Sequence, residues 1–222
     1  MYKSTKLVYN LHHKKQALQF TIEDILLTSE FEIKILSYPA QEILTKELSA
    51  LNEVERIKYD SFSSEKRKLE FFFTRILWAK FGKNEFITYN KLGKPCLTNG
   101  YIGISHSKNK IAVGFSKHYP VGIDIEHYSP KIHRIKHKFL SDQELIRYDL
   151  EDQNTITTLW SIKEALYKFR SEDGLSFRDD MDIIKIGDEN LAELNFNNSK
   201  IQVPFHKQCF KNFILTYCIK EI

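Results

Sequence analysis

Hydrophobic residues recur with two different periods along this chain, and these periods divide it into helical and extended segments. Apolar residues spaced three to four apart predict an amphipathic helix over residues 41–59 and another from the serine-rich turn at 61–64 to Phe81. Pro39 precedes the first helix, and Gly82 is suited to end the second. The two inner stripes are Leu44, Leu48, Leu51, Val54 and Ile57 in the first helix, and Leu69, Phe72, Phe73, Ile76 and Leu77 in the second.

Short apolar runs bounded by polar turns predict strands on both sides of a second helical region. That region begins at Ser141, where the spacing of Ser141 and Glu144 is typical of a capping box, and continues in a helix that contains Trp160. The predicted strands cover residues 31–36, 85–89, 101–105, 111–116, 121–126, 182–186, 192–196 and 213–219.

Helices followed by strands occur twice, over residues 40–116 and again over 141–219. We therefore expect an α+β fold, a pseudo-dimer of two similar lobes, each a small antiparallel sheet with packed helices. The lobes would comprise residues 1–117 and 118–222. No linker rich in Gly, Ser or Pro separates them, so we expect tight packing with a ligand cleft between the lobes.

Composition narrows the class of protein. The chain has 222 residues, 42% of them hydrophobic, which is typical of a globular protein with an adequate core. The net charge of +4 comes without a basic run of five residues, which argues against a nucleic-acid binder. Three cysteines without ligand spacing argue against a disulfide framework. With no apolar stretch near the ~18–20 residues of a membrane span, we expect a soluble, cytoplasmic protein with no membrane partner.

Two carboxylates interrupt the apolar strand at 121–126. Asp124 and Glu126 are two residues apart and so point to the same face of the strand. Like charges on one buried face repel each other and lose hydration, which a divalent cation would offset. The ordinary alternatives are that Asp124 caps a turn and that Glu126 ends the strand at solvent.

The helix that contains Trp160 offers a third carboxylate. Lys163, Glu164 and Lys168 fall on one helical face together with Trp160 and Tyr167. Three acids and two ammonium groups suit a metal-bound substrate that carries phosphate. Glu164 and Lys168 are alternatively an ordinary i,i+4 ion pair.

Three further motifs are each weak alone. The Gly93-Lys94-Pro95 segment is a plain turn or a rigid turn that presents a cation. Ser105, His106 and Ser107 form either a polar strand end or a cluster of donors for phosphate oxygens. The i,i+4 pair His133 and His137, with His127 upstream, has no zinc-protease pattern, and we expect a solvated basic helix instead.

Taken in order, these segments resemble the 4′-phosphopantetheinyl transferases. The resemblance rests on G-I-D-I-E at 122–126 and W-x-x-K-E-A-x-x-K at 160–168, which together are highly specific. G-K-P at 93–95, I-S-H-S at 104–107 and K-F-L-S-D-Q-E at 138–144 add to it, so the motifs cover about residues 56–178. The length is similar to that of the two-lobed class that activates nonribosomal peptide synthetases. Lys108 departs from the pattern, since many members have glycine there.

This resemblance implies a transferase that moves 4′-phosphopantetheine from coenzyme A to a serine of an apo acyl or peptidyl carrier protein. The reaction depends on Mg²⁺ and releases 3′,5′-adenosine bisphosphate. Two fused lobes favour a monomer. The alternatives are a catalytically silent module that binds carrier proteins and another magnesium-dependent phosphoryl transferase, although the latter usually has a glycine-rich phosphate loop.

The resemblance also implies roles for particular residues. Asp124, Glu126 and Glu164 would bind magnesium, and Lys168 with Lys163 would contact the pyrophosphate. Asp124, Glu164 and Lys168 would be catalytic, with Glu164 or a magnesium-bound hydroxide as the base. The residues implied to contact coenzyme A are Ser105 and His106 at the nucleotide phosphates, Lys94 and Pro95 beside the adenine, and Lys66, Arg67 and Arg75 near the 3′-phosphate.

Overall fold

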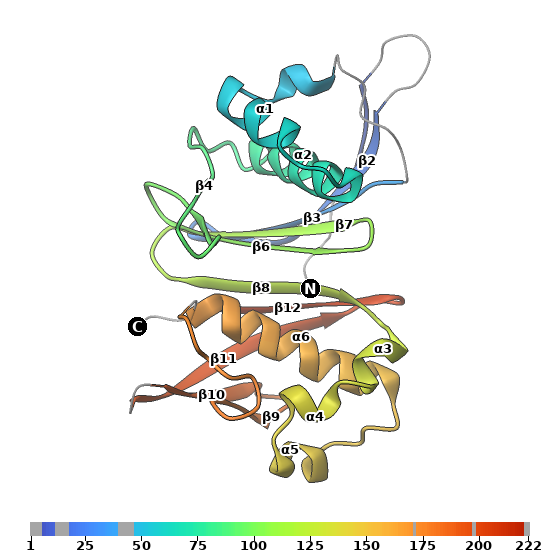
Figure 1. Ribbon diagram of the computed structural model, residues 1–222, viewed down its shortest axis with the longest axis vertical. Coiled ribbons are helices and arrows are strands. Elements are labelled where there is room, and N and C mark those ends of the chain that lie inside the picture. The colour runs from blue at the N-terminus through green and yellow to red at the C-terminus, as the bar shows by residue number, and fades with distance from the viewer. Residues whose placement is uncertain (1–5, 12–17, 40–46, 171, 197–198, 220–222) are drawn as a thin grey trace.

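The protein is an α+β structure built on two five-stranded antiparallel sheets, as the sequence predicts (Figure 1). The computed structural model describes residues 6–11, 18–39, 47–170, 172–196 and 199–219. The first sheet has the order β1-β2-β3-β7-β6 and the second the order β8-β12-β11-β10-β9. The strands of the first sheet are β1 (Lys6–Leu11), β2 (Leu18–Leu27), β3 (Phe31–Ser37), β6 (Tyr101–Ser107) and β7 (Lys110–Ser116).

The second sheet follows directly in the chain. Its strands are β8 (Val121–His127), β9 (Met181–Lys185), β10 (Leu191–Phe196), β11 (Ser199–Cys209) and β12 (Phe213–Ile219). A separate two-stranded ribbon joins β4 (Thr88–Tyr89) to β5 (Pro95–Cys96).

Three strands of each sheet are connected in the same order, β3, β6 and β7 in the first sheet and β8, β11 and β12 in the second. In the first, β3 leads through helices to the hairpin β6–β7, whose second strand returns beside β3. In the second, β8 leads through helices to strands that end in the hairpin β11–β12, and β12 returns beside β8. This common order agrees with the expected repeat, while the pseudo-dimer symmetry itself stays a prediction.

The helices cover the outer faces of the two sheets. α2 (Glu65–Ala79) packs on the first sheet, α1 (Glu53–Asp60) lies against α2, and a 3₁₀ turn (Glu47–Ala50) contributes to the same core (Figure 1). The long α6 (Gln153–Arg170) packs on the second sheet, and α3 (Pro130–His133) and α4 (Lys136–Phe139) lie against α6. α5 (Asp142–Arg147) is hydrogen-bonded to β9. Ser64 caps α2, and the Ser141–Glu144 capping box begins α5, as predicted. None of the described helices is long and apolar enough to span a membrane.

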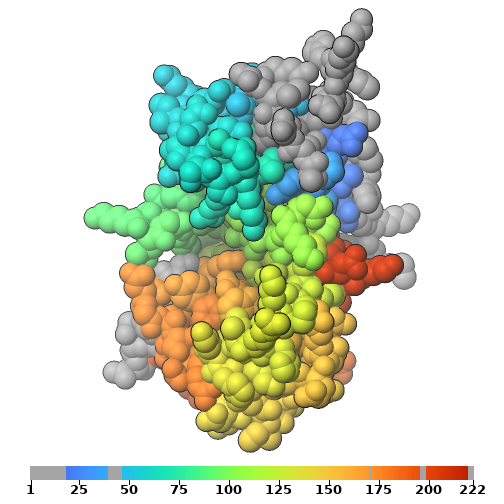
Figure 2. Space-filling model, turned by 45° about the vertical axis from the view of Figure 1, so that its right-hand side comes forward, coloured from blue at the N-terminus to red at the C-terminus, as the bar shows by residue number. Residues whose placement is uncertain are grey.

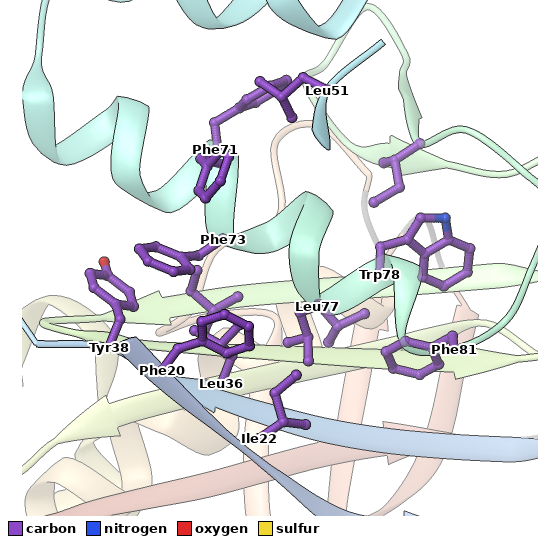
Figure 3. Packing of buried hydrophobic residues seen from close by; sticks show 14 of the residues in the cluster. Phe20, Ile22, Leu36, Tyr38, Leu51, Phe71, Phe73, Leu77, Trp78 and Phe81 are labelled. Carbon is purple, nitrogen blue, oxygen red and sulfur yellow. The ribbon is translucent and has the colours of Figure 1, made fainter. Parts of the chain in front are cut away.

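The result is a stack of four layers with three apolar cores between them (Figure 1). Phe72, Phe73 and Leu77 of α2 pack on the first sheet with Leu36 and Tyr38, and the rings of Tyr38 and Phe73 stack at 4.4 Å (Figure 3). A second core joins α6 to the second sheet. The third lies between the sheets, where Ile33, Ile35, Ile123, Ile125 and Leu215 meet. Because β8 faces the first sheet with its odd-numbered residues, Asp124 and Glu126 lie on its other side.

Part of the predicted first helix is wrong. The segment breaks at Asn52, which forms a capping box with Glu55 and begins α1 there. The new start changes the phase of the helix, so Val54 and Ile57 are 77% and 67% exposed while Tyr59 is buried. Leu48 and Leu51 are buried as expected, and residues 41–46 with Leu44 lie outside the described part of the chain.

Four of the described strands were not predicted, and one of them is the two-residue β5 that pairs with β4. β1 and β2 extend the first sheet, and β11 lies inside the second between β10 and β12. Pro204 and the alternating polar residues of β11 weaken its apolar signal, although Val203 and Phe205 are buried. In contrast, the strand predicted at 85–89 is reduced to the two residues of β4.

α6 packs very closely on β8 at Gly122. A Cβ atom built there would overlap the Ala165 carbonyl oxygen and lie 2.6 Å from Cβ of Phe169, both on α6. Only a residue without a side chain lets α6 pack this closely on β8. The contact brings the face of α6 that carries Glu164 and Lys168 against the carboxylates of β8.

We predict that Gly122→Ala destabilises the protein by about 3 kcal/mol or more, because backbone and packed side-chain atoms cannot yield to the methyl group. Urea unfolding measures this change. Gly187→Ala is the matched control, since a Cβ at Gly187 meets nothing within 4 Å, and it should change the free energy of unfolding by less than about 0.5 kcal/mol. Equal stabilities of the two variants would contradict the close contact.

Candidate active site

A groove runs between the two lobes and around the turn at residues 92–95. One cavity of about 270 Å³ is lined by residues of both lobes, including Ile104 of β6, Val121 of β8 and Lys168 of α6. A neighbouring cavity of about 600 Å³ lies along α2 and shares Gly93, Pro95 and Ile104 with the first. The surface is hollowed here between the cyan residues of α2 and the orange residues of α6 (Figure 2). The structure thus contains the expected cleft.

Asp124 does not itself line either cavity, but it is hydrogen-bonded to Lys168, which lines the smaller one. Only 4% of the surface of Asp124 is exposed. Its Oδ1 accepts hydrogen bonds from Ser105 Oγ at 2.9 Å and from Lys168 Nζ at 2.7 Å. Its Oδ2 is buried and has no hydrogen-bond partner among the residues that the structure describes. A buried carboxylate oxygen without a partner is costly, so this atom is available to a ligand that enters the cleft.

Glu126 lies two residues further along the same face of β8. Its Oε1 accepts a hydrogen bond from Ser107 Oγ at 2.7 Å and another from the backbone N–H of His127 at 3.0 Å. Burial raises the pKa of Glu126, the hydrogen bond from Ser107 lowers it, and the charge of Asp124 raises it further. The two carboxylates therefore repel each other, as the sequence predicts.

Glu164 faces both acids from α6. Burial raises the pKa of this carboxyl to about 7, Lys168 opposes the increase, and the charges of Asp124 and Glu126 add to it. Lys168 bridges the elements, with its ammonium 3.9 Å from Glu164 Oε2 and 3.0 Å from Ser105 Oγ. The predicted i,i+4 neighbours are thus part of a larger cluster that includes Asp124.

The donor set fits a hard divalent cation. Carboxylates, water and substrate phosphate oxygens are the ligands that Mg²⁺ prefers, and the unpartnered Asp124 Oδ2 lies on the face shared with Glu126. Within the described ranges, no three His, Cys, Asp or Glu side chains are grouped closely enough to form a ready-made metal site. A cation here would therefore depend on substrate oxygens and water as well as on Asp124, Glu126 and Glu164.

Lys163 does not lie in the cleft, and the expectation that it contacts pyrophosphate is corrected. Its side chain is fully buried on the other side of α6. The ammonium donates to Glu144 Oε2 at 2.6 Å and to the carbonyl oxygens of Phe177 and Met181 at 2.7 and 2.9 Å. Glu144 in turn accepts from the Ile183 N–H at 2.8 Å. The pair joins α6 to α5 and to the start of β9. The expectation was wrong because helical spacing places Lys163 only at the margin of the face that carries Glu164.

The three basic residues of α2 that were expected near the 3′-phosphate have different surroundings. Arg67 lines the larger cavity, and the charges of Arg67 and Lys66 contribute to a low pKa for His106. Arg75 is 7% exposed, and its Nε donates to Glu55 Oε1 at 3.0 Å. Its guanidinium also lies over the ring of Phe71, so Arg75 acts inside the lobe and does not line either cavity.

The remaining predicted contacts line the groove. Lys94 and Pro95 border the smaller cavity, and burial lowers the pKa of Lys94. His106 lines the larger cavity, and its Nε2 is 3.4 Å from Thr74 Oγ1. Burial, followed by the charge of Lys168, lowers the pKa of His106 to about 4, so the imidazole is neutral at pH 7.

The β6–β7 turn keeps its shape despite its lysine. Lys108 has φ of 51°, within the left-handed region that glycine adopts without strain. The Tyr38 hydroxyl donates to the Lys108 carbonyl oxygen at 3.4 Å. The departure from the motif therefore changes the residue and not the conformation that the position requires.

The sequence did not single out two polar neighbours of the acids, Ser107 as a partner of Glu126 and His127 as a partner of Ser107. The only signal was the spacing, since Ser105 and Ser107 repeat the interval of Asp124 and Glu126. His133 and His137 lie at the surface on α3 and α4, two short helices instead of the single helix expected.

Comparison with known proteins identifies the second half of the chain. Residues 120–218 match the family model of the 4'-phosphopantetheinyl transferase superfamily. This range contains β8, α6 and all three candidate acids. No curated protein matches the chain. The match confirms the resemblance for this region and supports phosphopantetheine transfer in general.

We predict that Lys163→Met lowers the free energy of unfolding by about 3–5 kcal/mol, because it leaves the fully buried Glu144 carboxylate without its cation. Chemical denaturation measures the loss. Lys185→Met removes the same group from an exposed pair with Glu189 and should cost less than about 1 kcal/mol. A stable Lys163→Met protein that binds coenzyme A weakly would instead restore Lys163 to the binding site.

Glu164 should make stability depend on pH in metal-free buffer. Its pKa is about 7 in the folded protein and 4.5 as the ordinary value, so between these values the folded state binds more protons. The contribution of this carboxyl to stability therefore falls as pH rises from 4.5 through 7. We expect Glu164→Gln to gain on the order of 1–3 kcal/mol relative to wild type between pH 5 and pH 8.

Urea unfolding at several pH values checks this prediction, with Glu53→Gln on the exposed first turn of α1 as the control. The control should follow the wild-type curve. A Glu164→Gln curve parallel to wild type would show that Glu164 is ionised in the free protein.

Proposed function

We propose that this protein transfers 4′-phosphopantetheine from coenzyme A to a serine of an apo acyl or peptidyl carrier protein, as the match of residues 120–218 to the 4'-phosphopantetheinyl transferase superfamily supports. The reaction releases 3′,5′-adenosine bisphosphate and depends on Mg²⁺. The observation that supports the proposal is Asp124, a buried acid with one oxygen that has no partner among the described residues. Its other oxygen accepts from Lys168, which lines the cavity between the two lobes.

We assign the two sides of the cleft to two parts of coenzyme A, the nucleotide and the pyrophosphate. The lobe of residues 1–117 would hold the nucleotide, with Lys94 and Pro95 beside the adenine and Ser105, His106, Lys66 and Arg67 toward the phosphates. The lobe of residues 118–222 would hold the pyrophosphate and the metal. Neutral His106 and the ammonium of Lys168 are donors suited to phosphate oxygens.

The chemical step forms a bond between the carrier serine oxygen and the phosphorus that bears pantetheine. The bond from this phosphorus to the bridging oxygen breaks, and negative charge moves onto the leaving phosphate. When bound by Asp124, Glu126 and Glu164, Mg²⁺ would neutralise part of this charge. Lys168 lies beside Asp124 and Glu164, so its ammonium would also be next to a pyrophosphate held at these acids. Donation to the phosphate oxygens would stabilise the transition state more than the ground state, because negative charge develops on these oxygens during the reaction.

The serine proton needs an acceptor near neutral pH. Glu164 has a pKa of about 7, which is suited to a general base. A cation-bound hydroxide is the alternative acceptor, and in that case Glu164 serves as a ligand only. Both roles keep Glu164 among the catalytic residues.

The carrier protein would dock beside α3 and α4. Lys131, Arg134 and Lys138 are exposed there, on the side of the second lobe that leads to α5. Carrier proteins present an acidic face next to their serine, so a basic surface would steer the encounter.

We predict that the wild-type protein, with coenzyme A and Mg²⁺, adds the mass of one phosphopantetheine to an apo carrier protein. Asp124→Asn should reduce this rate at least about 100-fold, because metal charge stabilisation contributes several kcal/mol. Intact-mass spectrometry follows the product, and Asp188→Asn at the exposed surface is the control with unchanged activity.

The same assay separates the alternatives. A silent module would bind the carrier without changing its mass, and a different phosphoryl transferase would add another mass. Activity of Asp124→Asn close to wild type in saturating Mg²⁺ would refute the assignment of Asp124.

A further inference from the structure

Two serines of β6 face the two acids of β8 with matching spacing. Ser105 Oγ donates to Asp124 Oδ1 at 2.9 Å, and Ser107 Oγ donates to Glu126 Oε1 at 2.7 Å. β6 belongs to the first sheet and β8 to the second, so both hydrogen bonds cross between the lobes. Ser105 also accepts a hydrogen bond from Lys168, whereas Ser107 is hydrogen-bonded to His127.

His127 completes the hydrogen bonding of Ser107. The Ser107 hydroxyl has one proton, which it donates to Glu126, and two lone pairs. One lone pair accepts at 3.1 Å from the His127 backbone N–H, which is shared with Glu126 Oε1 at 3.0 Å. The other lone pair lies 3.1 Å from His127 Nδ1. Since the hydroxyl proton is already used, Nδ1 must carry the hydrogen, which fixes the tautomer of His127.

Both groups are held firmly. Ser107 is 8% exposed and His127 is 7% exposed, and the imidazole packs against the ring of Phe213 at 5.9 Å. A buried hydroxyl with all three of its bonding positions used has one orientation. The carboxylate that accepts from it is therefore also restricted to one orientation.

We propose that Ser107 and His127 are positioning residues that orient the Glu126 carboxylate for binding a divalent cation. The proposal rests on the proposed function only in treating Glu126 as a metal ligand. Groups that hydrogen-bond a metal-ligating carboxylate typically change metal affinity 10- to 100-fold when removed. Ser107 and His127 act through Glu126 and do not touch the substrate.

Mn²⁺ is the probe, because the signal of the free ion in electron paramagnetic resonance gives the bound fraction without any turnover. We would titrate the full chain with Mn²⁺, with and without coenzyme A. Ser107→Ala removes the donor to Glu126, and His127→Leu removes the side-chain donor to Ser107. His127→Asn retains an N–H near the position of Nδ1, and Ser116→Ala changes a buried serine of β7 whose hydroxyl accepts from the Tyr119 N–H.

We expect Ser107→Ala and His127→Leu to weaken Mn²⁺ binding about 10-fold or more, with His127→Asn and Ser116→Ala within about twofold of wild type. Thermal unfolding in EDTA establishes that each variant is folded. If Ser107→Ala does not fold, the comparison of His127→Leu with His127→Asn decides the question, since only a positioning role separates two substitutions that both remove the imidazole.

Wild-type affinity in Ser107→Ala, or equal affinities in the two His127 variants, would overturn the proposal. A wild-type protein that binds no Mn²⁺ under either condition would overturn it as well. The proposed function fails separately: if the expected Mn²⁺ pattern is found but no carrier protein gains mass, the positioning role stands and the transferase assignment does not.

Discussion

The close contact between α6 and β8 at Gly122 is the constraint on which the site depends. A helix packed on a sheet normally keeps a layer of side chains between the two backbones. Here the missing Cβ lets the Ala165 carbonyl and Phe169 approach the strand directly. That distance brings Lys168 within 2.7 Å of Asp124 and allows Glu164 to sense the charges of both strand acids. The glycine of the G-I-D-I-E segment therefore has a packing role that the neighbouring carboxylates require.

The first sheet contributes the other half of the geometry. Its strand β6 lies against β8 near Gly103, where an added Cβ would be 2.8 Å from Ile123. Ser105 and Ser107 on the same strand then reach the acids of β8. The candidate site is thus formed by a strand of one sheet, a strand of the other and a helix, and the groove follows their junction.

The sequence predicted those parts of the fold in which local pattern and tertiary environment agree. The helix α2 and the strands β6, β7 and β8 have strong apolar signals, and all of them were predicted. Val54 and Ile57 were misplaced because a capping box at Asn52 determines the phase of α1 more strongly than its apolar stripe. β11 was missed because few of its residues are apolar and Pro204 interrupts them. A local pattern of this kind looks the same as a loop.

The site was predictable where spacing along one element determines which residues meet. Asp124, Glu126, Glu164 and Lys168 follow from strand and helix periodicity together with the motif. The role expected of Lys163 was wrong because helical spacing does not reveal the partner of a side chain. The Lys163 ammonium is bound by Glu144 and by two carbonyl groups from other segments of the chain. The pairing of Ser107 with Glu126 likewise depends on how β6 and β8 are aligned, which no single segment encodes.

That alignment has an evolutionary consequence. Each carboxylate of β8 accepts its serine hydrogen bond from the opposite lobe, at a separation of 19 positions in both pairs. A one-residue insertion in β6 before Ser105, with the start of the strand held in place, would turn both serines away from the acids at once, because alternate residues of a strand face opposite sides. Lineages that descend from this protein can therefore vary the helices and loops around the groove, but they can change the length of β6 before Ser105 only by replacing the two pairs together.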